Sequence, residues 1–320
     1  MSLSMGTVSI PLSQIIEVVV LAVRDDVEPS QINSIVLDIR LPRVILALLV
    51  GAVLAVLGAV MQGLFRNPLA DPSLIGVSGG ASVGASLMIV FAGGIMVTPL
   101  AGLSLISLGA FIGGVISTLV VYRVATSSLG TSVTTMLLAG IAIGAIAGAI
   151  NSLLSYFSDN QILRQISLWQ MGNLGGANWL KVSIMAGVSV ILLVLLPGQA
   201  KSLNGLLLGE SEARYLGIDV QTIKRKLIFL TALGVGVSVA LAGLIGFVGL
   251  IIPHMIRLLI GPDHRGLLPA SALAGASLLM VADSVARVVV LPAELPTGIL
   301  TALLGAPFFV VLLIRQRGEF

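Results

Sequence analysis

The chain has 320 residues, of which 57% are hydrophobic and only 10% are charged, and its mean hydropathy is +1.12. Soluble domains carry roughly 25% charged residues, so no soluble fold could hide this much apolar surface. With no cysteine in the sequence, disulfides, thiolate catalysis and cysteine metal sites are excluded. The net charge of +3 comes mainly from Lys and Arg between apolar runs, a pattern that predicts membrane topology rather than nucleic-acid binding.

Residues 1–43 form a polar N-terminal segment before the first long apolar run. The segment contains a possible amphipathic helix from Ser13 to Val23, which is too short to cross a membrane. It shows no cleavable signal sequence.

Residues 44–320 are predicted to form one transmembrane domain. A membrane-spanning helix needs about 20 mainly apolar residues, and the runs here are continuous, whereas a lipid-facing β-barrel would alternate apolar and polar residues. The predicted fold class is therefore all-α, a polytopic transmembrane helical bundle of about nine spans. We expect the spans at 44–63, 74–97, 99–122, 133–156, 181–197, 226–241, 243–260, 267–290 and 298–314.

The distribution of basic residues predicts which way the chain faces. Alternating the spans places five segments on one side, at 64–73, 123–132, 198–225, 261–266 and 315–320. That side, with its span ends, collects 11 of the 17 Lys and Arg residues. By the positive-inside rule it is cytoplasmic, so the loop 198–225 faces the cytosol and residues 1–43 face outward.

Glycines at helical spacing indicate where the spans meet. Gly140, Gly144 and Gly148 fall four apart, as do Gly109 and Gly113 on the preceding span. Small residues on one helix face let backbones approach closely, so we expect helix packing at these faces. A role in lining a transport path is the alternative.

Ordered sequence blocks covering most of residues 39–314 resemble the permease family that imports iron chelates and cobalamin through ATP-binding-cassette (ABC) systems, the type II importers. The blocks include IRLPR (39–43), LLVGAVLAVLGAVMQGLFRNPLADPSLIGVSGGASVG (48–84), LRQISLWQMGNLGGANW (163–179), LGESEARYLG (208–217), LAGLIGFVGLIIPHMIRLLIGPDHR (241–265) and ELPTGILTALLGAPFF (294–309). A match of this length is far more specific than a single short motif.

The resemblance also implies how the chain assembles and which proteins it binds. Two copies would form a homodimer in the bacterial inner membrane, with two ABC ATPase subunits below and a periplasmic substrate-binding protein above. ATP and Mg²⁺ would bind to the ATPase, so this chain would be no enzyme and would bind no metal or cofactor. The sequence has no GxxxxGK[ST] phosphate-binding loop, in agreement with that division. The family has ten spans, and the additional first one is not found in this sequence: either the start is truncated or that helix is lost. In its absence we expect the N-terminus outside.

The motif RNPLADP lies between the first two spans. Its prolines remove backbone donors and disfavour a continuing helix, which predicts a stiff turn. The resemblance implies that Asn67 and Leu69 form part of a cytoplasmic gate. It implies a second constriction near Thr131 and Ser132, whose hydroxyls could equally be helix N-caps.

The loop 198–225 interleaves apolar and charged residues on the predicted cytosolic side. Such a segment is too polar to span and too apolar to be left in water, so it requires a protein partner or the membrane surface. The resemblance implies coupling helices that contact the ATPase. The residues concerned are Leu206, Leu207, Leu208, Gly209, Glu210, Ala213, Arg214, Leu216 and Gly217.

Arg40, Arg43 and Arg287 lie at the predicted outer ends of two spans. Arginine snorkels to the interface at such positions without any special function. The resemblance implies that these residues dock acidic residues of the binding protein. Asp283, four residues before Arg287, is expected to form an intrahelical ion pair with it.

For the substrate, overall likeness favours an iron chelate, haem first and a ferric siderophore second, with cobalamin as the alternative. A remote alternative is an intramembrane serine protease. Gly76–Gly79 matches the GxSG around the serine of rhomboid proteases, with Ser78 as nucleophile and His254 as base.

Overall fold

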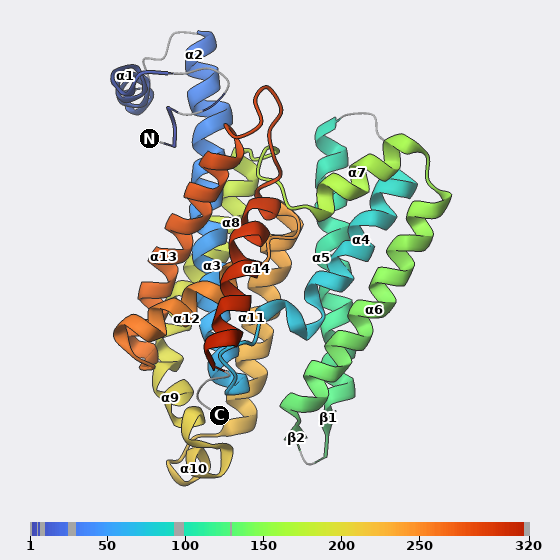
Figure 1. Ribbon diagram of the computed structural model, residues 1–320, viewed down its shortest axis with the longest axis vertical. Helices are drawn as coiled ribbons and strands as arrows, with labels where there is room; N and C mark the ends of the chain where they lie inside the picture. The colour runs from blue at the N-terminus through green and yellow to red at the C-terminus, as the bar shows by residue number, and fades with distance from the viewer. Residues whose placement is uncertain are drawn as a thin grey trace.

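The computed structural model describes residues 2–4, 6, 10–24, 30–92, 99–128 and 130–316. The all-α class is confirmed, because helices make up nearly all of the regular structure (Figure 1). Within the described residues, nine helices coincide with the expected spans. They are α3 (Leu41–Phe65), α4 (Val77–Ala92), α5 (Pro99–Ala125), α6 (Val133–Phe157), α8 (Trp179–Leu195), α11 (Val220–Ala242), α12 (Val248–Ile260), α13 (His264–Ala286) and α14 (Thr297–Gln316).

Shorter elements connect these helices. They are α1 (Leu12–Val23), α2 (Gln31–Ser34), a π-helical turn η1 (Ile35–Arg40), 3-10 turns η2 (Pro72–Ile75) and η3 (Pro197–Gln199), α7 (Asn160–Gln170), α9 (Ala200–Leu208), α10 (Glu210–Tyr215), and the strands β1 (Thr126–Ser127) and β2 (Gly130–Thr131). In the described chain, six helical stretches are long and apolar enough to cross a membrane, whereas α4, α12 and α14 are shorter apolar helices.

The elements define two ends of the bundle. The helices α1, α2 and α7 lie at one end, which we call the N-terminal end (Figure 1). The helices α9 and α10 and the β1–β2 hairpin lie at the opposite end, which we call the loop end. This arrangement follows the alternation of spans expected from the sequence.

The helix α3 forms the centre of the bundle. It packs against α13, α12, α11 and α8, and 83% of its most apolar stretch is buried. The helices α4, α5 and α6 pack on one another beside this group (Figure 1). The transmembrane core is thus built around one helix that is apolar on all sides, as expected for a helix surrounded by others.

Glycine pairs determine how closely the helices approach. A Cβ at Gly58 would overlap the backbone of Gly249 in α12, and one at Gly80 would overlap the backbone of Gly113 in α5. Gly109 packs in the same way on Gly84. The packing predicted for Gly109 and Gly113 is therefore present.

Several predicted span boundaries were wrong, by up to six residues. The span expected at 226–241 begins earlier, at Val220. The span expected at 243–260 begins only at Val248, because Gly243 (φ 71°) ends α11 and Phe247 has the left-handed φ of 68°. The span expected at 74–97 begins at Val77, after η2, and residues 93–97 lie outside the described ones. The span expected at 267–290 begins at His264 and ends at Ala286.

Two elements were not anticipated. The helix α7 lies in the polar stretch 157–180, where the Asp159 carboxylate accepts a hydrogen bond from the Ile162 amide. The β1–β2 hairpin joins α5 to α6. By contrast, α1 agrees with the amphipathic helix expected over Ser13–Val23, and its buried residues Ile15 and Val18 form a small cluster with Val36 of η1.

Candidate functional site

The loop end carries a two-helix projection, α9 and α10, joined at Gly209 (φ 130°). Leu206 and Ala213 are 2% and 0% exposed, so their side chains hold the projection together. Leu208 and Leu216 are 65% and 63% exposed. The residues predicted to couple to an ATPase therefore divide into a buried set, which also includes Gly209, and an outward set.

The rest of the predicted coupling set follows the same division. Leu207 and Glu210 are half-buried, whereas Arg214 and Gly217 are exposed. Tyr215 was not among the predicted coupling residues, although its side chain is also exposed between Arg214 and Leu216. Its position inside the motif LGESEARYLG, two residues from a buried alanine, was the available signal.

Side-chain bonds fix the projection to the bundle at two places. Asn204 of α9 donates to the Asp263 carboxylate at 2.6 Å and accepts from the His264 amide at 2.9 Å, at the turn between α12 and α13. Lys224 of α11 binds the Glu210 carboxylate at 2.5 Å. The projection is thus attached to two different parts of the bundle.

The turn after α3 carries the first predicted gate residues. Arg66 has a left-handed φ of 49° and ends the helix, and the Asn67 side chain accepts a hydrogen bond from the Leu69 amide at 2.9 Å. The Asp71 carboxylate then caps η2 through the Ser73 amide. Asn67 is exposed and Leu69 is half-buried at the loop end. The stiff turn is confirmed, while a gating role stays a prediction.

The β1–β2 hairpin carries the second pair of predicted gate residues. The Ser132 hydroxyl accepts a hydrogen bond from the Thr135 amide, so the N-cap reading of Ser132 is confirmed. Thr131 is 6% exposed, and its amide donates to the side chain of Gln221 in α11 at 3.1 Å. The hairpin is therefore fastened to the first turn of α11.

A polar cavity of about 700 Å³ opens between α4, α6 and α7. Asn151 donates to the Ser82 hydroxyl at 2.7 Å within it. Gly144 and Gly148 also line it, and nothing lies within 4 Å of where their Cβ atoms would be. Of the predicted row, Gly140 packs against the Leu74 carbonyl, and the Gly144 backbone lies close to Gly79 of α4, as expected for helix packing. The Cβ positions of Gly144 and Gly148 themselves face open space.

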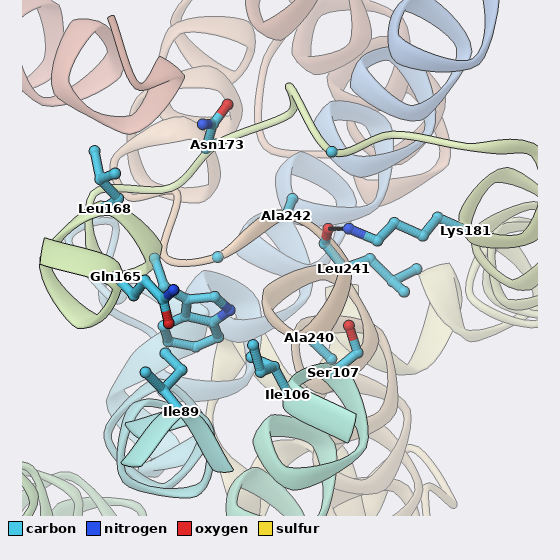
Figure 2. Close-up of a pocket in the computed structure, with 13 residues that line it drawn as sticks. Ile89, Ile106, Ser107, Gln165, Leu168, Asn173, Lys181, Ala240, Leu241 and Ala242 are labelled. Carbon is cyan, nitrogen blue, oxygen red and sulfur yellow. Dashed lines mark hydrogen bonds between the residues drawn. The ribbon is translucent and has the colours of Figure 1, made fainter. Parts of the chain in front are cut away.

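A second cavity, of about 510 Å³, lies towards the N-terminal end between α5, α7, α8 and α11. Figure 2 shows the Lys181 ammonium group donating to the Leu241 carbonyl, at 3.3 Å. Gln165 and Asn173 add amide groups to walls that are otherwise largely apolar.

A buried ionic cluster lies at the N-terminal end. The Asp283 carboxylate binds the Arg43 guanidinium at 3.0 Å and the Arg287 guanidinium at 3.2 Å, and it accepts from the Thr297 hydroxyl at 3.0 Å. Arg43 also binds Glu294 at 2.6 Å. The predicted ion pair between Asp283 and Arg287 is confirmed. The contact to Arg43, from a helix 240 residues away along the chain, was not foreseen.

The three arginines predicted to dock a binding protein are buried in this structure. Arg40, Arg43 and Arg287 are 6%, 4% and 3% exposed. Arg40 donates to the Leu3 carbonyl and Arg287 to the Ser2 hydroxyl, so N-terminal residues contact two of them. The accessible member of the cluster is Glu294, with a side chain 41% exposed.

Comparison with known proteins identifies the family of the chain. Residues 1–315 match the FecCD transport family. The chain belongs to this family. It is 49% identical over 285 residues to the hemin transport system permease protein HmuU of Yersinia pestis, covering 88% of this chain and 84% of that protein. It is 47% identical over 280 residues to the vitamin B12 import system permease protein BtuC of Escherichia coli O9:H4, with coverage of 88% and 83%.

The fold comparison agrees with the FecCD assignment. A transporter described as of the metal-chelate ABC type, solved in an inward-facing conformation, superposes with a TM-score of 0.81 at 35% identity. The alignment covers 98% of this chain and 93% of that one. This FecCD protein is thus a multi-pass permease of the ABC transporter class.

The protease alternative gains no support from the geometry. A serine nucleophile needs a base within hydrogen-bond reach. Neither ring nitrogen of His254 has a hydrogen-bond partner among the described residues, so His254 does not bind Ser78. The described chain also contains no group of three or more His, Cys, Asp or Glu side chains that could hold a metal ion.

Proposed function

We propose that this chain is the permease subunit of a bacterial inner-membrane ABC importer that carries haem into the cytoplasm. The FecCD match over residues 1–315 carries the importer part of the proposal, and the 49% identity to a hemin permease supports the choice of haem. A ferric siderophore is the second candidate, and cobalamin is the alternative. In this proposal the chain provides the path, and a separate ATPase hydrolyses ATP.

The face of α6 supports assembly as a homodimer. Only 17% of the most apolar stretch of α6 is buried, the lowest share of any candidate span among the described residues. Gly144 and Gly148 continue into Ser152 and Ser155 along the wall of the polar cavity. Small and polar residues on a membrane helix suit another helix or an aqueous path better than lipid. A second copy across this face would enclose the path.

The outward side chains of α9 and α10 support contact with an ATPase. Leu208, Tyr215 and Leu216 are all more than half exposed, on the side where the positive-inside rule places the cytosol. A cluster of large apolar side chains in water is typical of a protein interface. Two such projections in a homodimer would bind two ATPase subunits.

Docking of a periplasmic binding protein is proposed at the N-terminal end, around Arg40, Arg43 and Arg287. Asp283 and Glu294 already engage two of these arginines within the chain. An acidic residue of the partner could bind these arginines only by replacing a carboxylate of this chain. We expect it to displace Glu294 from Arg43, because Glu294 is the exposed carboxylate of the cluster.

The haem proposal rests on likeness to a hemin permease. The polar cavity between α4, α6 and α7 suits a substrate that passes through without being tightly bound. Its wall offers hydroxyl and amide groups from Ser82, Asn151 and Gln170. Groups of this kind hydrogen-bond to a polar substrate without ligating its metal. Selectivity is expected in the binding protein.

Reconstitution tests the proposal. The chain, its cognate ATPase and binding protein are placed in liposomes, and uptake of haem, a ferric siderophore and cobalamin is measured with and without ATP. We expect ATP-dependent haem accumulation and stimulation of hydrolysis by the haem-loaded binding protein. Uptake of cobalamin without haem would establish the alternative, and uptake of none of the three would overturn the importer assignment.

A further inference from the structure

Lys224 occupies a position in the fold where a charge is unexpected. It lies in the second turn of α11, where the buried residues Val220, Lys224, Leu227 and Ile228 follow a helical period. Its side chain is 2% exposed, whereas its neighbours Arg225 and Lys226 are exposed. Burying an ammonium group is costly unless it is paired and hydrogen-bonded. Lys224 is therefore expected to have both an acidic partner and a hydrogen-bond acceptor.

The contacts of Lys224 join two segments that are distant in the sequence. The Lys224 ammonium binds the Glu210 carboxylate at 2.5 Å and donates to the Thr131 carbonyl at 2.9 Å. Glu210 is the first residue of α10, in the projection at the loop end, and Thr131 belongs to the β1–β2 hairpin. One buried cation thus holds the projection and the hairpin to the same turn of α11.

The hairpin is bound to α11 by more hydrogen bonds than α10 is. The hairpin has a second bond to α11, from the Thr131 amide to Gln221. The link to α10 runs through Glu210, which follows Gly209 and is 35% exposed. A displacement of α10 would therefore pull first on the Glu210–Lys224 pair, and Lys224 would transmit it to the hairpin carbonyl.

We propose that Lys224 is the positioning residue that couples movement of the α9–α10 projection to the β1–β2 hairpin. This inference rests on the proposed function, in which the projection contacts the ATPase, and on the expectation that Thr131 and Ser132 at the hairpin form part of the cytoplasmic gate. Lys224 is not in contact with substrate or nucleotide. It acts by holding the α9–α10 projection and the β1–β2 hairpin in a fixed position relative to each other.

The test compares Lys224→Met, which removes the charge and donors but keeps an unbranched side chain, with Lys224→Arg, which retains both. Lys226→Met is the matched control, because it deletes an exposed cation two residues away. Each variant is assembled with the ATPase in liposomes, and ATP hydrolysis and substrate uptake are measured together. A spin label at Ser128 in both copies reports hairpin separation with and without ATP.

We expect Lys224→Met to hydrolyse ATP at close to the wild-type rate while the number of substrates moved per ATP falls by about tenfold. The ATP-dependent change in label separation should also be lost. Lys224→Arg should restore a large part of both, and Lys226→Met should behave as wild type. A purely packing role would instead lower assembly, hydrolysis and uptake in parallel.

Glu210→Gln provides a second variant in case Lys224→Met does not assemble, because it changes the exposed end of the link and keeps an acceptor. It should reduce the coupling ratio less than Lys224→Met does. Normal coupling and label movement in Lys224→Met, or in Glu210→Gln where only that variant assembles, would overturn the Lys224 proposal and leave the importer assignment intact. A wild-type complex without ATP-dependent uptake would instead overturn the importer assignment, and the Lys224 proposal with it.

Discussion

Asp283 joins several parts of the chain at the N-terminal end of the bundle. Its carboxylate, 1% exposed, contacts Arg43, Arg287 and Thr297 from three parts of the chain. Removing one partner of a buried ionic group leaves the other charge uncompensated, at a cost of about 3 to 5 kcal/mol. We therefore expect Asp283→Ala to lower the free energy of unfolding by that amount, measured by denaturant titration in mixed micelles.

Glu294→Gln is the matched control for this prediction. Glu294 also binds Arg43, but its side chain is 41% exposed, and exposed pairs contribute about 1 kcal/mol or less. If Asp283→Ala unfolded at the same denaturant concentration as Glu294→Gln, the cluster would not stabilise the fold.

Residue-scale prediction from sequence worked only for local geometry. The spacing of Asp283 and Arg287 along one helix predicted their pair, because residues four apart share a helix face. The partner Arg43 could not be inferred, since the contact depends on how α3 packs against α13. For the same reason, the division of the coupling residues into a buried Leu206 and an exposed Leu216 was not predictable.

Alanine substitutions at Gly80 of α4 and Gly144 of α6 are expected to have different effects on the free energy of unfolding. A Cβ at Gly80 would overlap the Gly113 carbonyl and Ser117, so Gly80→Ala should destabilise the fold by about 1 to 3 kcal/mol. A Cβ at Gly144 has nothing within 4 Å, and alanine favours a helix by about 1 kcal/mol over glycine. Gly144→Ala should therefore leave stability unchanged or slightly raised.

Thermal unfolding of the two variants in one detergent checks this difference. Equal losses would mean that α6 packs against another part of the chain as tightly as α4 packs against α5.

Hydropathy predicted the long helices better than the connections between them. A continuous apolar run has one stable form in lipid, so the centres of all nine spans were correct. The helix α7 and the β1–β2 hairpin are polar and are specified by caps and side-chain bonds, such as Asp159 to Ile162 and Gln221 to Thr131. Hydropathy does not register these features.

The orientation of the whole molecule is testable because the native chain has no cysteine. Ser158 follows α6 at the N-terminal end, and Ser202 lies in α9 at the loop end (Figure 1). We expect a membrane-impermeant maleimide to label Ser158→Cys in spheroplasts, and Ser202→Cys only after the membrane is opened. Labelling of both in intact spheroplasts would contradict the topology inferred from the basic residues.

The helix that includes α3 has a consequence for the membrane surface. Helical backbone runs from Gln31 to Phe65, 35 residues in all. At about 1.5 Å per residue this is about 50 Å, whereas the hydrocarbon layer is about 30 Å thick. Even with some tilt, its first turns extend beyond the hydrocarbon layer. A protein that approaches the N-terminal end would therefore contact the first turns of this helix, α2 and η1, before it reached the lipid headgroups.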